Sequence, residues 1–272
     1  MRGLLASPLG FLIGLSLGAL GGGGSILAVP ALVYAAGQDP KGATTTSLVL
    51  VTITALVGII PHWRAGRVRL AAGALFGLAG VGGSLLGSHW NSAVNPDVLL
   101  LAFAGLMLVA AFAMWRRLDT SPKPAPQSAG AAANLERVVP GETQVRIDAA
   151  TVVKVIFAGS FVGLLTGFFG VGGGFVIVPA LVLALGFTMP EAVGTSLLVI
   201  AVNSTVALMT RLPGGSIEWD IVLPFTIASL LGVMVGSRLA STRDPSFLQK
   251  WFIGFLFVIA IYTAISSIVA LV

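Results

Sequence analysis

The sequence contains no cysteine and little charge. Without cysteine, disulfide bonds, thiolate nucleophiles and cysteine metal sites are excluded. Histidine occurs only as His62 and His89, so we predict neither a metal site nor a cofactor. Charged residues make up 9% of the chain, and none of Asp, Glu, Lys or His lies in the middle of an apolar segment, which argues against an obvious proton relay. No nucleophile with its base is visible, so we do not expect an enzyme.

Long apolar segments fill most of the chain. Hydrophobic residues make up 56% of it, and runs of about twenty apolar residues match a hydrocarbon layer roughly 30 Å thick. We therefore predict an all-α, multi-pass integral protein of the cell (inner) membrane. The expected segments are 9–36, 43–61, 68–90, 97–115, 152–186, 191–210, 220–239 and 247–271.

The net charge of +5 comes from basic residues that lie between the apolar segments rather than on one basic face. Membrane topology explains such an excess better than nucleic acid does. The expected partners are therefore the lipid bilayer and a small anionic substrate, with no nucleic acid. A homodimer is left open.

One glycine-rich run occurs twice, 149 residues apart. Residues 21–33 read GGGGSILAVPALV and residues 170–182 read GVGGGFVIVPALV, with eight of thirteen positions identical. Glycine inside an apolar helix is destabilising, so its duplication indicates a shared role. We predict two related halves joined by a solvated linker. The divisions are a first transmembrane repeat at 1–115, a cytoplasmic linker at 116–150 and a second transmembrane repeat at 151–272.

The first apolar segment of each half is too long for one upright crossing. As a continuous helix, segment 9–36 would measure about 42 Å. If each such segment breaks at its glycines into a hairpin, three helices cross per half and the repeats are inverted. If each spans instead, eight helices cross in parallel repeats. Hairpins place twelve basic residues on one side against three, and spanning helices place eleven against four. We predict the inverted hairpin arrangement, with eight spanning helices as the alternative.

The glycine clusters predict an anion site. A helix break frees backbone amides, the next half-helix directs its positive end at the break, and glycine lets a ligand approach the main chain. The substrate-binding residues predicted on this basis are Gly22, Gly23, Gly24, Ser25, Gly172, Gly173 and Gly174. The alternative is close helix packing through small residues.

Hydroxyl and amide side chains follow each hairpin. Thr45 and Thr46 align with Thr195 and Ser196 at a shift of 150, one to two turns inside their helices. Such hydroxyls can donate to an oxyanion, or bond back to a carbonyl of the preceding turn. Asn203 lies deeper, where an amide needs partners. We predict all five as substrate-binding residues.

Basic side chains end two of the apolar segments. His62 and Arg64 end one segment and Arg211 ends another, and together they could form an electrostatic vestibule for anions. The alternative is that they snorkel to the membrane interface. Glu191 follows Thr188 by three residues, the spacing of a capping box, so we interpret it as a helix cap rather than a proton carrier.

These motifs resemble the TauE/SafE family of sulfite and organosulfonate exporters, also called the 4-toluene sulfonate uptake permease family. The resemblance lies in the paired glycine runs with Pro30 and Pro179, in the run Gly194-Thr195-Ser196, and in the match of 83–88 (GSLLGS) to 232–237 (GVMVGS). It covers essentially the whole chain except the linker.

The resemblance implies a secondary transporter, a permease for small sulfur-containing anions such as sulfite, sulfoacetate or other sulfonates. We expect export, because an inside-negative potential drives anions outward by about 2.3 kcal/mol per charge per 100 mV. A passive anion channel and a non-transporting membrane accessory protein are the alternatives.

Overall fold

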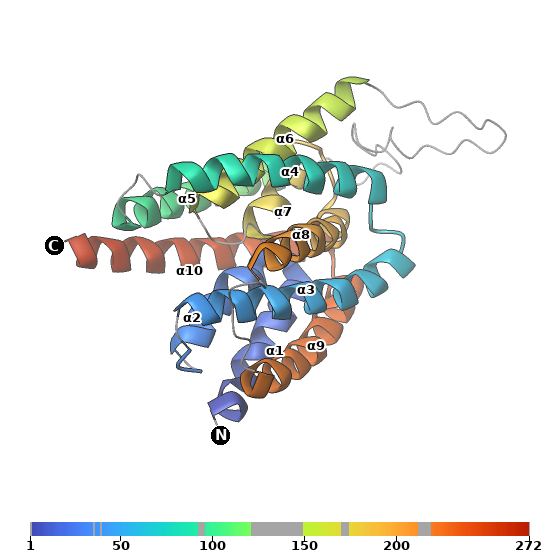
Figure 1. The fold of residues 1–272 in the computed structure, drawn as a ribbon. Coiled ribbons are helices and arrows are strands. Elements are labelled where there is room, and N and C mark those ends of the chain that lie inside the picture. The colour runs from blue at the N-terminus through green and yellow to red at the C-terminus, as the bar shows by residue number, and fades with distance from the viewer. Residues whose placement is uncertain are drawn as a thin grey trace.

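The computed structural model describes residues 2–34, 36–38, 40–91, 96–120, 149–169, 174–211 and 219–271. Within these ranges the chain is all-α, with ten helices and no strand (Figure 1). The helices are α1 (Arg2–Leu20), α2 (Gly23–Tyr34), α3 (Pro40–Arg64), α4 (Leu70–Asn91), α5 (Pro96–Thr120), α6 (Ala149–Phe169), α7 (Gly174–Leu183), α8 (Met189–Arg211), α9 (Trp219–Thr242) and α10 (Pro245–Leu271).

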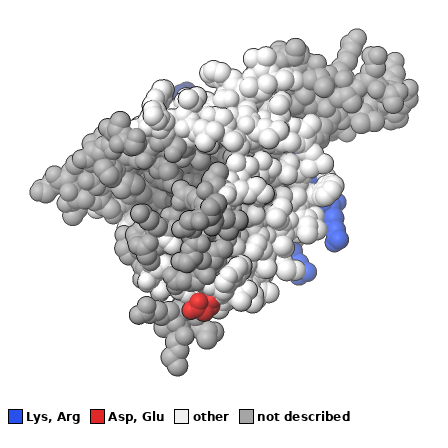
Figure 2. Space-filling view, viewed as in Figure 1, with Lys and Arg blue, Asp and Glu red and all other residues white. Residues whose placement is uncertain are grey.

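Five of these helices carry apolar stretches long enough to cross a membrane, in α3, α4, α8, α9 and α10. Their outer surface is apolar too, since side chains such as Leu85, Met209 and Val258 are largely exposed. On the face shown in Figure 2, the described surface is mostly uncharged, and the few charged side chains lie toward its margins. Burying such a surface in lipid removes the apolar side chains from water. The prediction of an all-α integral membrane protein is confirmed.

The helix ends agree with the predicted apolar segments to within a few residues, except at the termini of α1 and α5. α1 begins at Arg2 rather than near residue 9, and α5 continues through Thr120 into the predicted linker. Residues 121–148, most of that linker, lie outside the described residues. The division into two repeats and a cytoplasmic linker stays a prediction.

Helices from the two halves interlock through glycine. α1 packs along α9, and α6 packs along α4. A Cβ on Gly14 would overlap the carbonyl of Ser229, and a Cβ on Gly163 would overlap the carbonyl of Gly80. Adding 149 to 14 and to 80 gives 163 and 229, so one contact is the other with the halves exchanged. A further pair related in this way is Gly10 with Phe225 and Gly159 with Phe76. Small residues permit this close approach of helix backbones.

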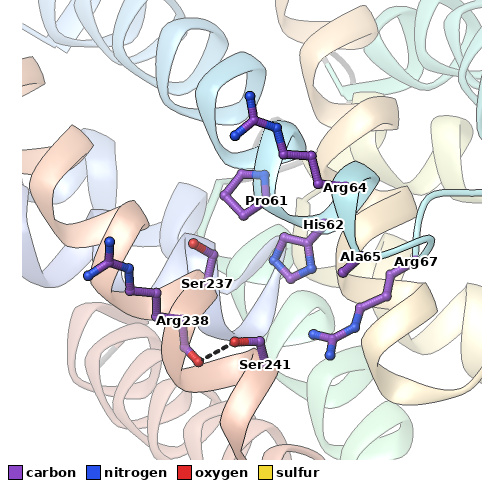
Figure 3. A pocket seen from close by; sticks show the side chains of 8 residues that line it. All are labelled: Pro61, His62, Arg64, Ala65, Arg67, Ser237, Arg238 and Ser241. Carbon is purple, nitrogen blue, oxygen red and sulfur yellow. Dashed lines mark hydrogen bonds between the residues drawn. The ribbon is translucent and has the colours of Figure 1, made fainter.

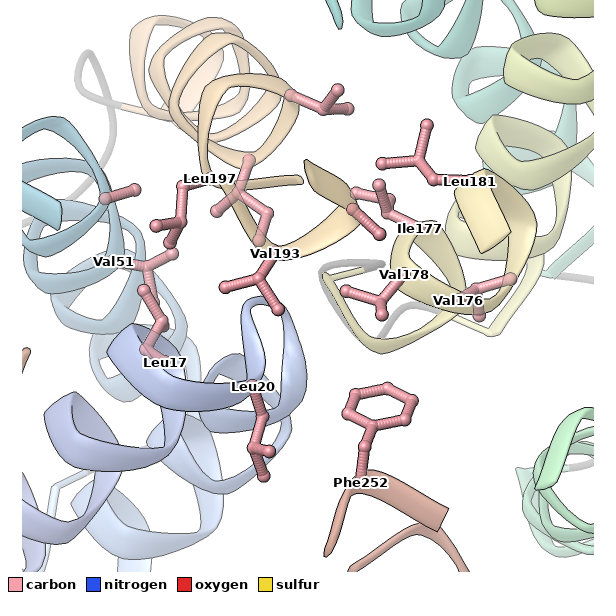
Figure 4. Close-up of a cluster of buried hydrophobic side chains, with 14 of the residues drawn as sticks. Leu17, Leu20, Val51, Val176, Ile177, Val178, Leu181, Val193, Leu197 and Phe252 are labelled. Atoms are coloured by element: carbon pink, nitrogen blue, oxygen red, sulfur yellow. The ribbon is translucent and has the colours of Figure 1, made fainter. Parts of the chain in front are cut away.

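The core lies where the short helices meet α3 and α8. Figure 4 shows Leu20 at the end of α1, Val178 on α7 and Val193 on α8 in one buried cluster with Phe252 of α10. Val178, Val193 and Phe252 are fully buried, and Leu20 nearly so. The cluster lies beside the first glycine-rich run, which follows Leu20.

Candidate functional site

The first predicted helix break is present at Gly21 and Gly22. Gly21 has φ +73°, a conformation that side chains other than glycine's rarely adopt, and α2 begins two residues later. A Cβ on Gly24 would overlap the carbonyl of Ile13. In a continuous helix these two residues would lie about 16 Å apart. The chain therefore folds back at the glycines, and α1 and α2 form a hairpin.

The second break separates α6 from α7. α6 ends at Phe169 and α7 begins at Gly174. The two helices contact each other. The intervening residues 170–173 lie outside the described residues, and with them the predicted site residues Gly172 and Gly173.

The two breaks meet in the interior. A Cβ on Gly22 would overlap the backbone of Gly174, and a Cβ on Gly174 would meet the hydroxyl of Ser25. A Cβ on Gly21 would likewise meet the hydroxyl of Ser196. The structure thus brings together four predicted site residues: Gly22, Ser25, Gly174 and Ser196. Gly23, another predicted site residue, begins α2.

In the described conformation this meeting point is closed. The backbones of Gly22 and Gly174 are too near for a Cβ to fit between them, and therefore for an anion. Ser25 donates its hydroxyl to the carbonyl of Gly22 at 2.8 Å, which is a local bond inside the turn. An anion at this point requires the two hairpin tips to separate.

The predicted hydroxyls make different contacts. Ser196 donates back to the carbonyl of Val193 at 2.8 Å, as the alternative interpretation expected. Thr195 instead accepts a hydrogen bond from the backbone N–H of Arg69 at 3.1 Å. Thr45 and Thr46 are buried, and the hydroxyl of Thr46 has no hydrogen-bond partner.

The turns before these helices keep a spacing of 149 residues rather than 150. Gly37 and Gly186 both have positive φ, and α3 and α8 begin at positions that also differ by 149. Thr46 therefore corresponds to Thr195, and Ser47 to Ser196.

Asn203 lies at the contact of α8 with α4. Its Oδ1 atom is buried and has no hydrogen-bond partner, and its amide nitrogen would be 3.6 Å from a Cβ on Gly80. The equivalent position in the first half is Thr54, whose hydroxyl bonds to Leu50 O at 2.6 Å and reaches the Ser229 hydroxyl at 3.4 Å. An unsatisfied buried oxygen is costly, so Asn203 is a candidate for contact with water or solute.

A cavity of about 320 Å³ opens at the ends of α3 and α9 (Figure 3). It is lined by Pro61, His62, Arg64, Ala65, Arg67, Ser237, Arg238 and Ser241. Three of these residues are arginines, and no carboxylate is among them. Such a lining attracts anions.

His62 and Arg64 of the predicted vestibule both line this cavity, whereas Arg211 ends α8 and its side chain is outside the described part of the chain. His62 is only 1% exposed, with Nε2 3.2 Å from the carbonyl of Gly18. Gly18 precedes the break at Gly21 by three residues, about 4.5 Å of helix. The cavity therefore adjoins the tip of the first hairpin.

The sequence analysis missed four polar residues of the cavity: Arg67, Ser237, Arg238 and Ser241. One signal was available. The hairpin arrangement places Arg64, Arg67 and Arg238 on the same side of the membrane, and a search for basic residues sharing a side would have grouped them.

The prediction that Glu191 caps α8 is confirmed. Its Oε2 accepts from the backbone N–H of Thr188 at 3.1 Å and from the Thr188 hydroxyl at 2.8 Å. The other oxygen, Oε1, pairs with Arg69 at 2.6 Å. Both side chains are about a quarter exposed or less. The ion pair links the α3–α4 connection to α8, and its contribution to the free energy of unfolding is modest because water screens it.

Comparison with known proteins agrees with this architecture. The family described as "Sulfite exporter TauE/SafE" matches residues 6–263. A "Probable membrane transporter protein" of Xylella fastidiosa (strain Temecula1) is 33% identical over 97% of this chain and 95% of its own length. "Probable membrane transporter protein YdhB" of Bacillus subtilis is 24% identical over 88% of this chain and 91% of its own. No solved structure matches the chain. The chain therefore belongs to the TauE/SafE family of membrane transporters.

Proposed function

We propose that this chain is a secondary transporter that exports small sulfur-containing anions, such as sulfite, sulfoacetate or other sulfonates, across the plasma membrane. The family description names sulfite, and relatives over nearly the full length are named as probable transporters. The substrate class is taken from that description and from the cationic lining of the cavity.

One observation carries the proposal: a cavity with three arginines and no carboxylate among its described lining residues adjoins the tip of a glycine-broken hairpin. An anion drawn into the cavity is about one helical turn of α1 from the break at Gly21 and Gly22, where α2 begins and a helix leaves its first amides without intrahelical partners. At this break Gly22 lies against Gly174, the first residue of α7.

The closed contact between Gly22 and Gly174 favours a carrier over a passive channel. A channel needs a continuous open path, whereas a carrier alternates between closed arrangements around a central site. Parting the two hairpin tips would open the site. The cost of separating packed backbones is offset by the anion's contacts with the exposed amides.

The transport assay uses the purified full chain in liposomes. We expect saturable uptake of radiolabelled sulfite and sulfoacetate, accelerated by unlabelled anion on the other side. Acetate and protein-free liposomes serve as controls. If folded protein transports neither sulfite nor sulfoacetate, the proposed function is wrong. Flux that neither saturates nor shows exchange would favour a passive channel.

Inverted repeats are part of the proposal. α4 starts just after Arg67, whereas α9 ends just after Arg238 and Ser241, and all three residues line the one cavity. α4 and α9 occupy equivalent positions in the two halves, since their first residues are 149 apart. The cavity nevertheless lies at the N-terminal end of α4 and at the C-terminal end of α9, so the two equivalent helices run in opposite directions (Figure 1). This opposite direction supports inversion and argues against parallel repeats.

Single cysteines test the topology, because the natural chain has none. Ala65, Ser246 and Asp220 are exposed. With inverted repeats, Ala65→Cys and Ser246→Cys react with an impermeant maleimide from the same side, the cytoplasm, and Asp220→Cys from the opposite side. If instead Ala65→Cys and Asp220→Cys share a side, the repeats are parallel.

A further inference from the structure

The cavity at the ends of α3 and α9 contains a buried imidazole with an unused nitrogen. His62 Nε2 lies 3.2 Å from the carbonyl oxygen of Gly18. A carbonyl only accepts hydrogen bonds, so Nε2 carries the hydrogen, and in the neutral ring Nδ1 is left as an acceptor. Nδ1 is buried and has no hydrogen-bond partner. Figure 3 shows the ring between Ser237 and Ala65, within the cavity lining.

Among the described residues that line the cavity around this imidazole, every charged side chain is cationic. Arg64 and Arg67 come from the end of α3 and its connection to α4, and Arg238 comes from α9. α1 contributes the carbonyl of Gly18, and α8 contributes Gly194, whose Cβ would lie 3.1 Å from that of His62.

The acidic residue in the first turn of α8 does not neutralise this cluster. Glu191 is bonded to Arg69 at 2.6 Å and to Thr188, and neither oxygen is left without a partner. The cavity therefore keeps an excess of positive charge.

The lining hydroxyls are committed to the helix backbone. Ser237 donates to the carbonyl of Met234 at 3.1 Å, and Ser241 donates to that of Arg238 at 2.7 Å. Arg67 bonds to the carbonyl of Ala240 at 3.5 Å, which leaves most of its five N–H groups for a ligand. Attraction for an anion comes from the guanidinium groups, and the unpartnered acceptor His62 Nδ1 works against it.

Protonation of His62 resolves this mismatch. A bare Nδ1 lone pair repels an anion's oxygen, whereas the protonated nitrogen donates a charge-assisted hydrogen bond to it. We propose that this cavity is a binding site for a small oxyanion, and that His62 takes up a proton at Nδ1 as the anion binds. The inference rests on the proposed function for the class of anion.

The cavity suits an anion of this size. Its volume of about 320 Å³ is several times the roughly 30 Å³ that one water molecule occupies, which leaves room for a sulfonate and some water. Binding a monovalent sulfonate together with one proton adds no net charge to the site. A phospholipid headgroup offers the same oxyanion chemistry, so the experiment includes it as a separate arm.

The test is calorimetric titration of methanesulfonate into the purified full chain in lipid-free detergent. Methanesulfonate stays ionised between about pH 5 and pH 8, so a pH effect on binding belongs to the protein. Because anion binding takes up a proton, affinity should rise as pH falls, by up to about tenfold per pH unit. Repeating the titration in buffers of different ionisation enthalpy should show uptake of up to one proton per anion.

Two matched pairs of variants identify the groups. His62→Gln keeps an N–H donor for the Gly18 carbonyl but cannot titrate, so it should bind without pH dependence. The control His89→Gln, at an exposed position near the end of α4, should retain the pH dependence of binding. Arg238→Gln should weaken binding at least about tenfold, in the range of a lost charged hydrogen bond. The control Arg243→Gln should not weaken binding, because Arg243 is exposed over the ring of Phe247 and does not line the cavity.

Three outcomes overturn the site: no methanesulfonate binding by the natural chain at any pH, pH dependence that persists in His62→Gln, or displacement of methanesulfonate by phosphatidylglycerol but not by sulfite. Proton-linked binding without flux in liposomes would keep the site and reject the transport function. Flux without proton-linked binding would reject the site alone.

Discussion

Replacing Gly22 with valine should reduce anion flux by roughly 5- to 150-fold, because overpacking costs about 1–3 kcal/mol. Any side chain at this position collides with the carbonyl oxygen, the carbonyl carbon and the Cα of Gly174. These are backbone atoms, so they cannot move aside as a side chain does by changing its rotamer. The tips of the two hairpins would be held apart, and the closed arrangement through which a carrier must pass would be lost. Initial rates of sulfite uptake into liposomes measure the effect.

Gly42→Val is the matched control. Gly42 lies in the first turn of α3, and a Cβ there meets nothing within 4 Å. Gly22→Ala, which adds only one carbon, should be intermediate. Unfolding temperatures of all three variants separate lost transport from lost folding. A Gly22→Val protein that melts like the natural chain and transports normally would remove the glycine contact from the mechanism.

The helix breaks could be predicted from the sequence because their cause is local. A cluster of glycines destabilises a helix wherever it lies, and Gly21 adopts a positive φ that other residues disfavour. The ends of α3 and α8 were equally predictable, since long apolar runs with flanking polar residues fix where a helix enters and leaves the membrane. The hydrogen bonds from Thr188 to Glu191 follow from spacing alone.

The pairing of helices between the halves could not be predicted. In a membrane both faces of a helix are apolar, so hydrophobic periodicity does not tell which side packs on protein and which faces lipid. Glycines at positions 10, 14 and 18 mark a close contact, but only the structure identifies α9 as the partner.

The burial of His62 shows the same limit at the candidate site. Its place near the end of an apolar segment is typical of an interface residue. The structure buries it because the first hairpin brings the carbonyl of Gly18 against α3, and because Gly194 of α8 packs on its Cβ. Both are long-range contacts that depend on the fold. Arg238 joins the cavity for the same reason, since α9 begins more than 150 residues after the end of α3 in sequence and ends beside it.

Gly14→Leu and Gly163→Leu should each destabilise the protein strongly, and by similar amounts. At both positions a new side chain would enter a carbonyl group of the helix packed alongside, Ser229 of α9 for the first and Gly80 of α4 for the second. Forcing those helices apart should cost about 3 kcal/mol or more, which corresponds to a fall of roughly 6–12 °C in unfolding temperature for a chain of this size. Thermal unfolding of the purified variants in detergent measures both.

Gly105→Leu is the control, because nothing lies within 4 Å of a Cβ at that position on α5. It should melt within a few degrees of the natural chain. The equality of the two destabilising effects is the informative result, since the two contacts are one contact with the halves exchanged. A large loss for Gly14→Leu beside a tolerated Gly163→Leu would mean that the repeats, though alike in sequence, do not share their packing.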